Sequence, residues 1–284
     1  MSFNANQLVP DRRIHALLIG PSGSGKTAAA CCFPGKTFIL DFDDRAKGPI
    51  NGCTFLQEKV KSGQIEIETI LPWKGQRATT IKDIYTILEI LDNRITKGEV
   101  ENVILDSTTA LRRLFVNEAT NSDKTNIKHH IIIDVKVSQK QDYLYAATAM
   151  SNIIYDNLKT FRCNLFISTH LKDKVIASPT QEDPERVIVV GQSITAPGQL
   201  AVEIPSWFDE TWEFEIDASI KSKPPERFVV FQGLFAKTSM RNIGYEENGK
   251  WTPTHKLNIT NKNFYEVLKP TLERMKGEAL KEIK

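Results

Sequence analysis

The sequence predicts an α/β protein built on a mainly parallel sheet with helices on both faces. Three observations carry this prediction. Short, continuously apolar strands alternate with amphipathic helical segments over residues 14–169, which is typical of a parallel sheet covered on both sides. A glycine-rich octapeptide joins the first strand to the first helix. Polar residues end several strands, at the edge where a parallel sheet places its ligand.

The first strand is the apolar run at residues 14–19, and a helix is predicted to open at Thr27. The octapeptide between them matches G-x-x-x-x-G-K-[ST] and consists of Gly20, Pro21, Ser22, Gly23, Ser24, Gly25, Lys26 and Thr27. In this motif the backbone N–H groups face a triphosphate, the lysine reaches its β- and γ-phosphates and the hydroxyl ligates Mg²⁺. The following helix N-terminus favours the same anion. The sequence therefore predicts a P-loop that binds ATP and Mg²⁺.

The same alternation continues along the first part of the chain. Strands are predicted at residues 36–41, 64–70, 103–106 and 164–169, and helices at residues 81–95 and 143–158. Residues 64–70 alternate apolar and polar side chains, which predicts a half-exposed edge strand.

The later part of the chain has a different pattern. Strands are predicted at residues 186–190, 211–216 and 227–231, without clear helices between them, so we expect an antiparallel extension of the sheet. A helix is predicted from about Lys262, interrupted by Pro270. We therefore expect a core at residues 1–245 and a C-terminal extension at residues 246–284.

Three polar strand ends are candidates for the chemistry. Asp106 ends a short apolar strand and is predicted to hold the Mg²⁺ shell as the Walker B carboxylate, or else to cap the helix that starts at Ser107. Residues 41–44 carry three carboxylates, and one of them near the γ-phosphate would polarise water; the alternative is a solvated acidic turn. His170 follows a strand and is predicted to contact the γ-phosphate, unless it is an ordinary surface histidine.

Composition places few limits on the function. The formal net charge is +2, which neither demands nor excludes a nucleic-acid partner. No apolar run approaches the ~20 residues of a membrane span, so we expect no membrane association and a cytoplasmic protein. The four cysteines, at positions 31, 32, 53 and 163, lack metal-ligand spacing, which predicts free and mostly buried thiols.

Together these strand-end residues resemble the RecA-type ATPase core of recombinases and ring helicases. By position, Asp43 takes the place of the acidic residue that activates water, where that family prefers Glu. Asp106 and Ser107 resemble the Asp-Ser ending of its Walker B strand, and His170 stands where recombinases carry a γ-phosphate-sensing Gln. With His there, the chain is similar to a compact phage-encoded branch of RecA-like ATPases linked to single-strand annealing and recombination. A phage-encoded member would act in the cytoplasm of a bacterial host.

Later segments extend the resemblance over about residues 12–245. Residues 193–200 and 207–210 resemble the region before the late strands of that branch. Lys237 and Arg241 resemble its K-x-x-x-R pair, whose members reach the γ-phosphate of a neighbouring subunit; the alternative is a solvated turn. The resemblance implies a homo-oligomer, either a ring or a filament, built without the additional terminal elements of bacterial recombinases.

The resemblance also implies single-stranded DNA as a partner, together with phage recombination or single-strand-binding proteins. Two long loops are its candidate contacts: residues 117–140, and the segment after His170 with Lys172 and Lys174. Lysines attract phosphates, but neither loop has aromatic residues for stacking, so solvated loops are the alternative. A DNA motor of helicase or packaging type, or a non-catalytic ATP-switched annealing or scaffold module, would share the site. A small-molecule kinase would need a lid with several arginines. It is disfavoured because residues 170–207 contain a single arginine, Arg186.

Overall fold

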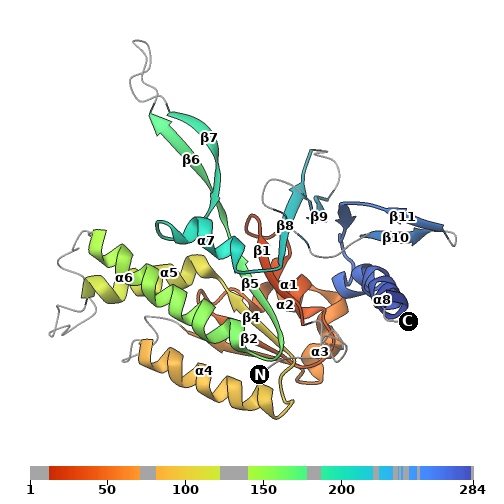
Figure 1. The fold of residues 1–284 in the computed structure, drawn as a ribbon, viewed down its shortest axis with the longest axis horizontal. Coiled ribbons are helices and arrows are strands. Elements are labelled where there is room, and N and C mark those ends of the chain that lie inside the picture. The colour runs from red at the N-terminus through yellow and green to blue at the C-terminus, as the bar shows by residue number, and fades with distance from the viewer. Residues whose placement is uncertain are drawn as a thin grey trace.

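The structure is a computed structural model that describes residues 13–70, 81–121, 140–177, 187–219, 224–232, 236, 238, 243–247 and 250–282. Within these residues the main sheet has eight strands (Figure 1). In spatial order they are β12 (Lys256–Asn258), β9 (Glu226–Val230), β8 (Glu210–Asp217), β1 (His15–Ile19), β5 (Asn164–Thr169), β4 (Asn102–Asp106), β2 (Thr37–Asp41) and β3 (Ile65–Thr69).

The strands from β8 to β3 are all parallel to their neighbours, and only β9 and β12 pair in the antiparallel sense. The predicted fold class, a mainly parallel sheet extended by late antiparallel strands, is confirmed. The alternating strand Ile65–Thr69 lies at the edge of the sheet, as its pattern predicts.

Helices cover both faces of this sheet (Figure 1). One face carries α4 (Ile81–Thr96), α5 (Thr108–Asn121), α6 (Lys140–Ser151) and α7 (Leu200–Ser206). The other carries α1 (Lys26–Cys31), α2 (Lys47–Gly52), α3 (Gln57–Lys61) and α8 (Phe264–Glu282). None of the helices in the described ranges is long and apolar enough to cross a membrane.

The central strands are apolar throughout because each faces a hydrophobic cluster on both sides. Along β1, Leu17 and Ile19 belong to the cluster under α4 to α7, whereas Ala16 and Leu18 belong to the cluster under α1 and α8. All four side chains are at most 1% exposed. The sheet is therefore the middle layer of a three-layer sandwich.

The prediction for residues 211–216 is wrong in its direction. This segment lies within β8, which runs parallel to β1 and not antiparallel to it. The connection that permits a parallel strand contains the short helix α7, which has Pro205 inside it and is too short to give a periodic sequence pattern.

The prediction for residues 186–190 is also wrong in its pairing. The strand exists as β7 (Val187–Ile194), but it pairs antiparallel with the unpredicted strand β6 (Leu171–Ala177) in a separate two-stranded ribbon. This ribbon extends away from the body of the molecule (Figure 1). A second ribbon is formed by β10 (Gly244–Glu247) and β11 (Lys250–Pro253).

The C-terminal helix is not interrupted at Pro270, contrary to the prediction. Buried Phe264 and Leu268 anchor the helix on one side of the proline. Thr271 anchors it on the other, because its buried hydroxyl exchanges hydrogen bonds of 3.2 Å with the backbone of Gly244. These contacts hold the helix path although the proline lacks an N–H donor.

Candidate functional site

Four neighbouring parallel strands, β2, β4, β5 and β1, bring their carboxyl ends to one edge of the sheet, where a pocket of about 460 Å³ opens. The glycine-rich loop after β1, Asp43 after β2, Asp106 at the end of β4 and His170 after β5 all line it. The full lining is Ser22, Gly23, Gly25, Lys26, Thr27, Ala28, Ala29, Asp43, Arg45, Pro49, Gly52, Cys53, Phe55, Asp106, His170, Arg227, Ile259, Asn261, Lys262 and Phe264.

The loop curls over the start of α1. Gly23 and Gly25 have φ values of 78° and 97°, in the left-handed region that glycine tolerates best. Lys26 is 6% exposed, and its ammonium donates to the carbonyls of Gly20 and Pro21, both at 2.8 Å. Burial lowers the pKa of Lys26 to about 8. The ammonium is thus desolvated, and it is stabilised by neutral hydrogen-bond acceptors and by Coulomb attraction from Asp106. Such a cation is suited to bind a polyanion.

Gly20 connects the loop to two other elements. A Cβ at this position would collide with the backbone carbonyl of Phe214 on β8, so no larger residue fits. The Gly20 carbonyl also lies 3.2 Å from Nδ1 of His170. Because a carbonyl only accepts, the proton of a neutral His170 belongs on Nδ1. Burial first and Lys26 second lower the pKa of His170 below its ordinary value.

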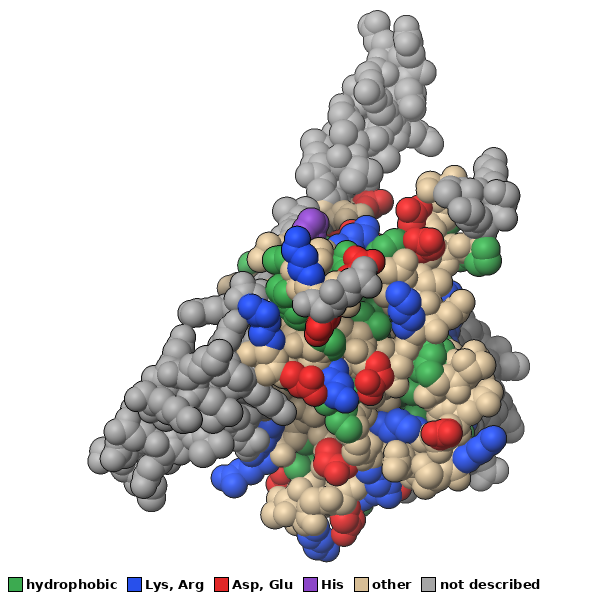
Figure 2. Space-filling model, turned by 90° about the vertical axis from the view of Figure 1, so that its right-hand side faces the viewer, with side chains coloured by type: hydrophobic (Ala, Val, Ile, Leu, Met, Phe, Trp, Pro, Cys, Tyr) green, Lys and Arg blue, Asp and Glu red, His purple; other side chains and the backbone are tan. Residues whose placement is uncertain are grey.

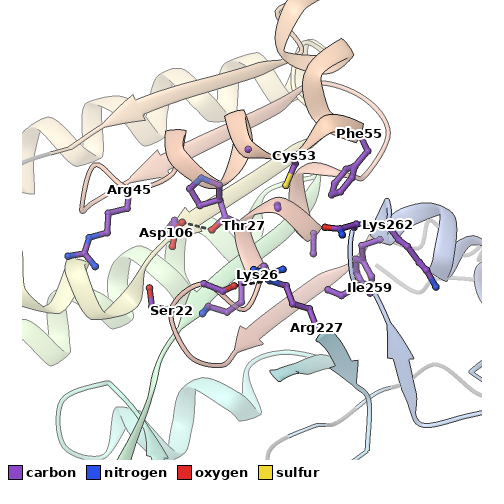
Figure 3. Close-up of a pocket in the computed structure, with 18 of the residues that line it drawn as sticks. Ser22, Lys26, Thr27, Arg45, Cys53, Phe55, Asp106, Arg227, Ile259 and Lys262 are labelled. Carbon is purple, nitrogen blue, oxygen red and sulfur yellow. Dashed lines mark hydrogen bonds between the residues drawn. The ribbon is translucent and has the colours of Figure 1, made fainter. Parts of the chain in front are cut away.

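Asp106 is held by hydroxyl groups from two elements. Thr27 Oγ1 donates to Asp106 Oδ2 at 2.6 Å (Figure 3), and Ser168 Oγ on β5 donates to Oδ1 at 2.5 Å. The alternative role as a helix cap falls to the next residue, because the Ser107 hydroxyl accepts from the Ala110 N–H at 3.3 Å. A threonine hydroxyl beside a carboxylate is a hard oxygen donor set of the kind that Mg²⁺ prefers.

The three carboxylates of residues 41–44 have different environments. Asp41 is fully buried and accepts backbone N–H groups of Asp43, Arg45 and Ala46, so it closes the turn. Asp44 is exposed. Asp43 lines the pocket, and its buried Oδ1 finds no hydrogen-bond partner among the described residues. Burial, with the charges of Asp106 and Asp41, raises the pKa of Asp43 to about 6. Asp43 is therefore the carboxylate suited to accept a proton.

Several residues that line the pocket or support it had no predicted role. Ser168 lies within β5, and the mostly apolar sequence of this strand gave no sign of a polar role. Arg227 on β9 donates from Nε to the carbonyl of Gly23 at 3.1 Å, from 204 positions along the chain. Residues 49–55 and 259–262 complete the wall. Their sequences contain no nucleotide-binding motif, and only the folded structure brings these two segments together beside the loop.

Other predicted residues are not brought to this site by the described part of the structure. Lys237 and Arg241 lie outside the described residues. So do most of the basic side chains of the first predicted DNA loop, namely Lys124, Lys128, His129, His130 and Lys136. Lys140 is exposed at the start of α6, and Lys172 is exposed on β6. The four cysteines are free, as predicted.

The chain is similar to a family model and to a solved structure. The chain matches no curated protein sequence significantly. Among solved structures, a KaiC-like protein from the hyperthermophilic archaeon Pyrococcus horikoshii OT3 is similar, with 11% sequence identity and a TM-score of 0.37 over 76% of this chain and 77% of that one. A family model described as "AAA domain" matches residues 12–240. The match spans the glycine-rich loop, all the strand-end residues of the pocket and most of the chain, and the protein therefore belongs to this AAA domain family.

Proposed function

We propose that the protein is a Mg²⁺-dependent ATPase that acts on single-stranded DNA as a homo-oligomer, in phage recombination or replication. The observation that supports hydrolysis most directly is the meeting of Lys26, Thr27, Asp106 and Asp43 in one pocket. They come from three places, namely the glycine-rich loop with the start of α1, the turn after β2 and the end of β4, and each has the chemistry that phosphoryl transfer to water requires.

The pocket fits ATP and Mg²⁺ on its own features. The Lys26 ammonium donates to the Gly20 and Pro21 carbonyls, which are neutral and therefore weaker acceptors than phosphate oxygens. The phosphates of ATP would face this ammonium and the backbone of residues 23–26. Thr27 Oγ1 and, through water, Asp106 would hold Mg²⁺. The ion, when bound, neutralises charge on the β- and γ-phosphates.

Asp43 is the proposed base that orients the attacking water. Asp43 lines the same pocket, and its buried Oδ1 has no hydrogen-bond partner among the described residues. Its raised pKa of about 6 increases its basicity while leaving it ionised at neutral pH. Arg45 lies beside it, with Nε 4.0 Å from Asp43 Oδ2.

His170 is the proposed sensor of the γ-phosphate. His170 lies between β5 and β6. Its carbonyl accepts at 2.8 Å from the N–H of Thr195, the residue that follows β7. The start of β6 and the end of β7 therefore meet at His170, a residue of the pocket. A change of the His170 hydrogen bond to Gly20 on nucleotide binding would act at the base of this ribbon.

The DNA role rests on the resemblance to phage recombination ATPases and on the ribbon. Lys172 is an exposed cation near the base of the ribbon. Figure 2 shows acidic and basic side chains interspersed over the coloured part of the face that it draws, and the coloured atoms form no basic stripe there. Lys237 and Arg241 would complete the site of a neighbouring subunit.

The test is the rate of phosphate release from ATP with and without single-stranded DNA. We expect DNA to raise the rate at least several-fold, and added salt to weaken the stimulation because lysine–phosphate contacts release counterions. Lys172→Ala should weaken the stimulation more than Lys82→Ala, which removes an exposed lysine of α4. A rate that is unchanged by DNA would contradict the DNA role and favour a motor or switch with a protein partner.

A second prediction concerns proton uptake. At pH 8 about half of the Lys26 side chains are neutral before nucleotide binds, because burial lowers the pKa to about 8. Phosphate oxygens stabilise the ammonium, so binding of MgATP should take up a fraction of a proton. Calorimetric titrations in buffers of different ionisation enthalpy measure this uptake. We expect it to fall between pH 8 and pH 6.5, where Lys26 is already charged. Uptake that instead grows toward pH 6.5 would assign it to a histidine or carboxylate.

A further inference from the structure

The pocket continues well beyond the groups that would hold phosphates. Figure 3 shows Arg45, Asp106 and Ser22 at one end of it, and Phe55, Ile259 and Lys262 at the other. Its volume of about 460 Å³ is of the size that takes a drug-sized ligand.

The second end has apolar walls from two distant segments. Phe55 is half-buried on the short 3₁₀ turn Thr54–Leu56, next to Cys53. Ile259 follows β12 and is 7% exposed. Its Cδ1 would lie 3.9 Å from a Cβ placed on Gly25, so this wall lies directly against the glycine-rich loop. An aromatic ring and a branched aliphatic chain are the surfaces on which a flat heterocycle packs.

Polar groups lie between and around these walls. Arg227 contacts the loop, because its Nε donates to the Gly23 carbonyl, and its Cδ would lie 3.6 Å from a Cβ placed on Gly25. A guanidinium has five N–H groups, of which this bond uses one. Asn261 and Lys262 are exposed at the rim. Donors therefore lie where the ribose and α-phosphate of a nucleotide would leave the loop.

We infer that this second end binds the nucleobase and ribose of the nucleotide, with the base against Phe55 and Ile259 and with Arg227 beside the ribose and α-phosphate. The segment after β2 and the late strands β9 and β12 then together form this half of the nucleotide site, although the motifs of the chain all lie in the other half. The inference rests on the proposed function, because it assumes that the glycine-rich loop holds the phosphates of the same molecule.

The first test compares binding of ATP with binding of inorganic tripolyphosphate, both with Mg²⁺. Phe55→Ala should weaken ATP binding about tenfold or more, as loss of an aromatic stacking partner does. Tripolyphosphate binding should stay within about twofold, since that ligand has no base. Val60→Ala, which truncates an exposed apolar residue of α3, should change neither affinity.

The outcomes separate this inference from the proposed function. Lys26→Ala should weaken both ligands, because they share the phosphate loop. If Phe55→Ala leaves ATP affinity unchanged, or weakens both ligands equally, the base does not lie against Phe55 and the inference is wrong. If the unaltered chain binds neither ligand, the assignment of the loop to phosphates fails, and the inference fails with it.

A second measurement needs no variant of the apolar wall. Cys53 lines the second end and is half-buried, whereas the other three cysteines are buried. Burial raises the pKa of the Cys53 thiol, so a maleimide should label it faster at pH 8.5 than at pH 7. ATP should slow this labelling severalfold and tripolyphosphate should not, with Cys53→Ser as the control that removes the signal. Equal labelling with and without ATP would overturn the inference.

Discussion

Lys26→Ala should reduce the rate of ATP hydrolysis at least about a hundredfold, the scale at which a preorganised charge stabilises a transition state. Lys26 is buried at the start of α1 and faces the pocket from within the loop. No other cation of the described residues is placed inside the loop, so no neighbour replaces it. Phosphate release at saturating MgATP measures the effect.

The matched control for this variant is Lys82→Ala, which removes an exposed lysine from α4 and should leave the rate unchanged. Thermal unfolding of both variants checks the fold. A folded Lys26→Ala protein with full activity would place hydrolysis outside this pocket.

Asp43→Asn should have the second largest effect, a loss of about 10²- to 10⁴-fold in kcat, because general base catalysis contributes on that scale. Binding of MgATP should change much less, since the proposed role of Asp43 is to orient water and not to hold the nucleotide. The matched control is Asp44→Asn, one residue away on the exposed side of the same turn. Equal losses in both variants would assign the effect to the turn and not to a base.

The pH profile gives Asp43 an independent signature. Its pKa is raised to about 6, first by burial and then by the charges of Asp106 and Asp41. The base form is therefore lost as the pH falls through about 6, so kcat/KM of the unaltered chain should fall there and that of Asp43→Asn should not. A carboxyl whose folded pKa lies above its unfolded value destabilises the fold when ionised, so the variant should gain stability above pH 6 but not near pH 4. A fall of kcat/KM that persists in Asp43→Asn would belong to another group.

The central parallel strands were predictable because they are buried on both faces and therefore read as largely apolar runs. In the later half β8 and β9 were predicted as strands, but β6, the pairing of β7 and the direction of β8 were not. The strand Leu171–Ala177 contains Lys172, Asp173 and Lys174, a charged pattern that reads as a loop, because the ribbon it forms with β7 stands away from the main sheet. The direction of β8 depends on α7, whose seven residues are too few to show a helical period.

The candidate site divides in the same way. Lys26, Thr27 and Asp106 follow from a motif and a strand end, because local sequence alone places them. Choosing among Asp41, Asp43 and Asp44 required the backbone, since only the turn closed by Asp41 shows which carboxylate is left facing the pocket. The wall of residues 49–55 and 259–262 has no local pattern, because it forms only where a segment that follows β2 and a segment that follows β12 meet at the pocket.

The most direct test of the central claim is the initial rate of phosphate release from ATP by the unaltered chain, with Mg²⁺ and with Mg²⁺ removed by EDTA. We expect turnover with Mg²⁺ that is abolished by EDTA, because Thr27 and Asp106 are the proposed oxygen ligands of that ion. Turnover that is independent of Mg²⁺, or no turnover in any condition in which MgATP is bound, would contradict the assignment of this pocket to ATP hydrolysis.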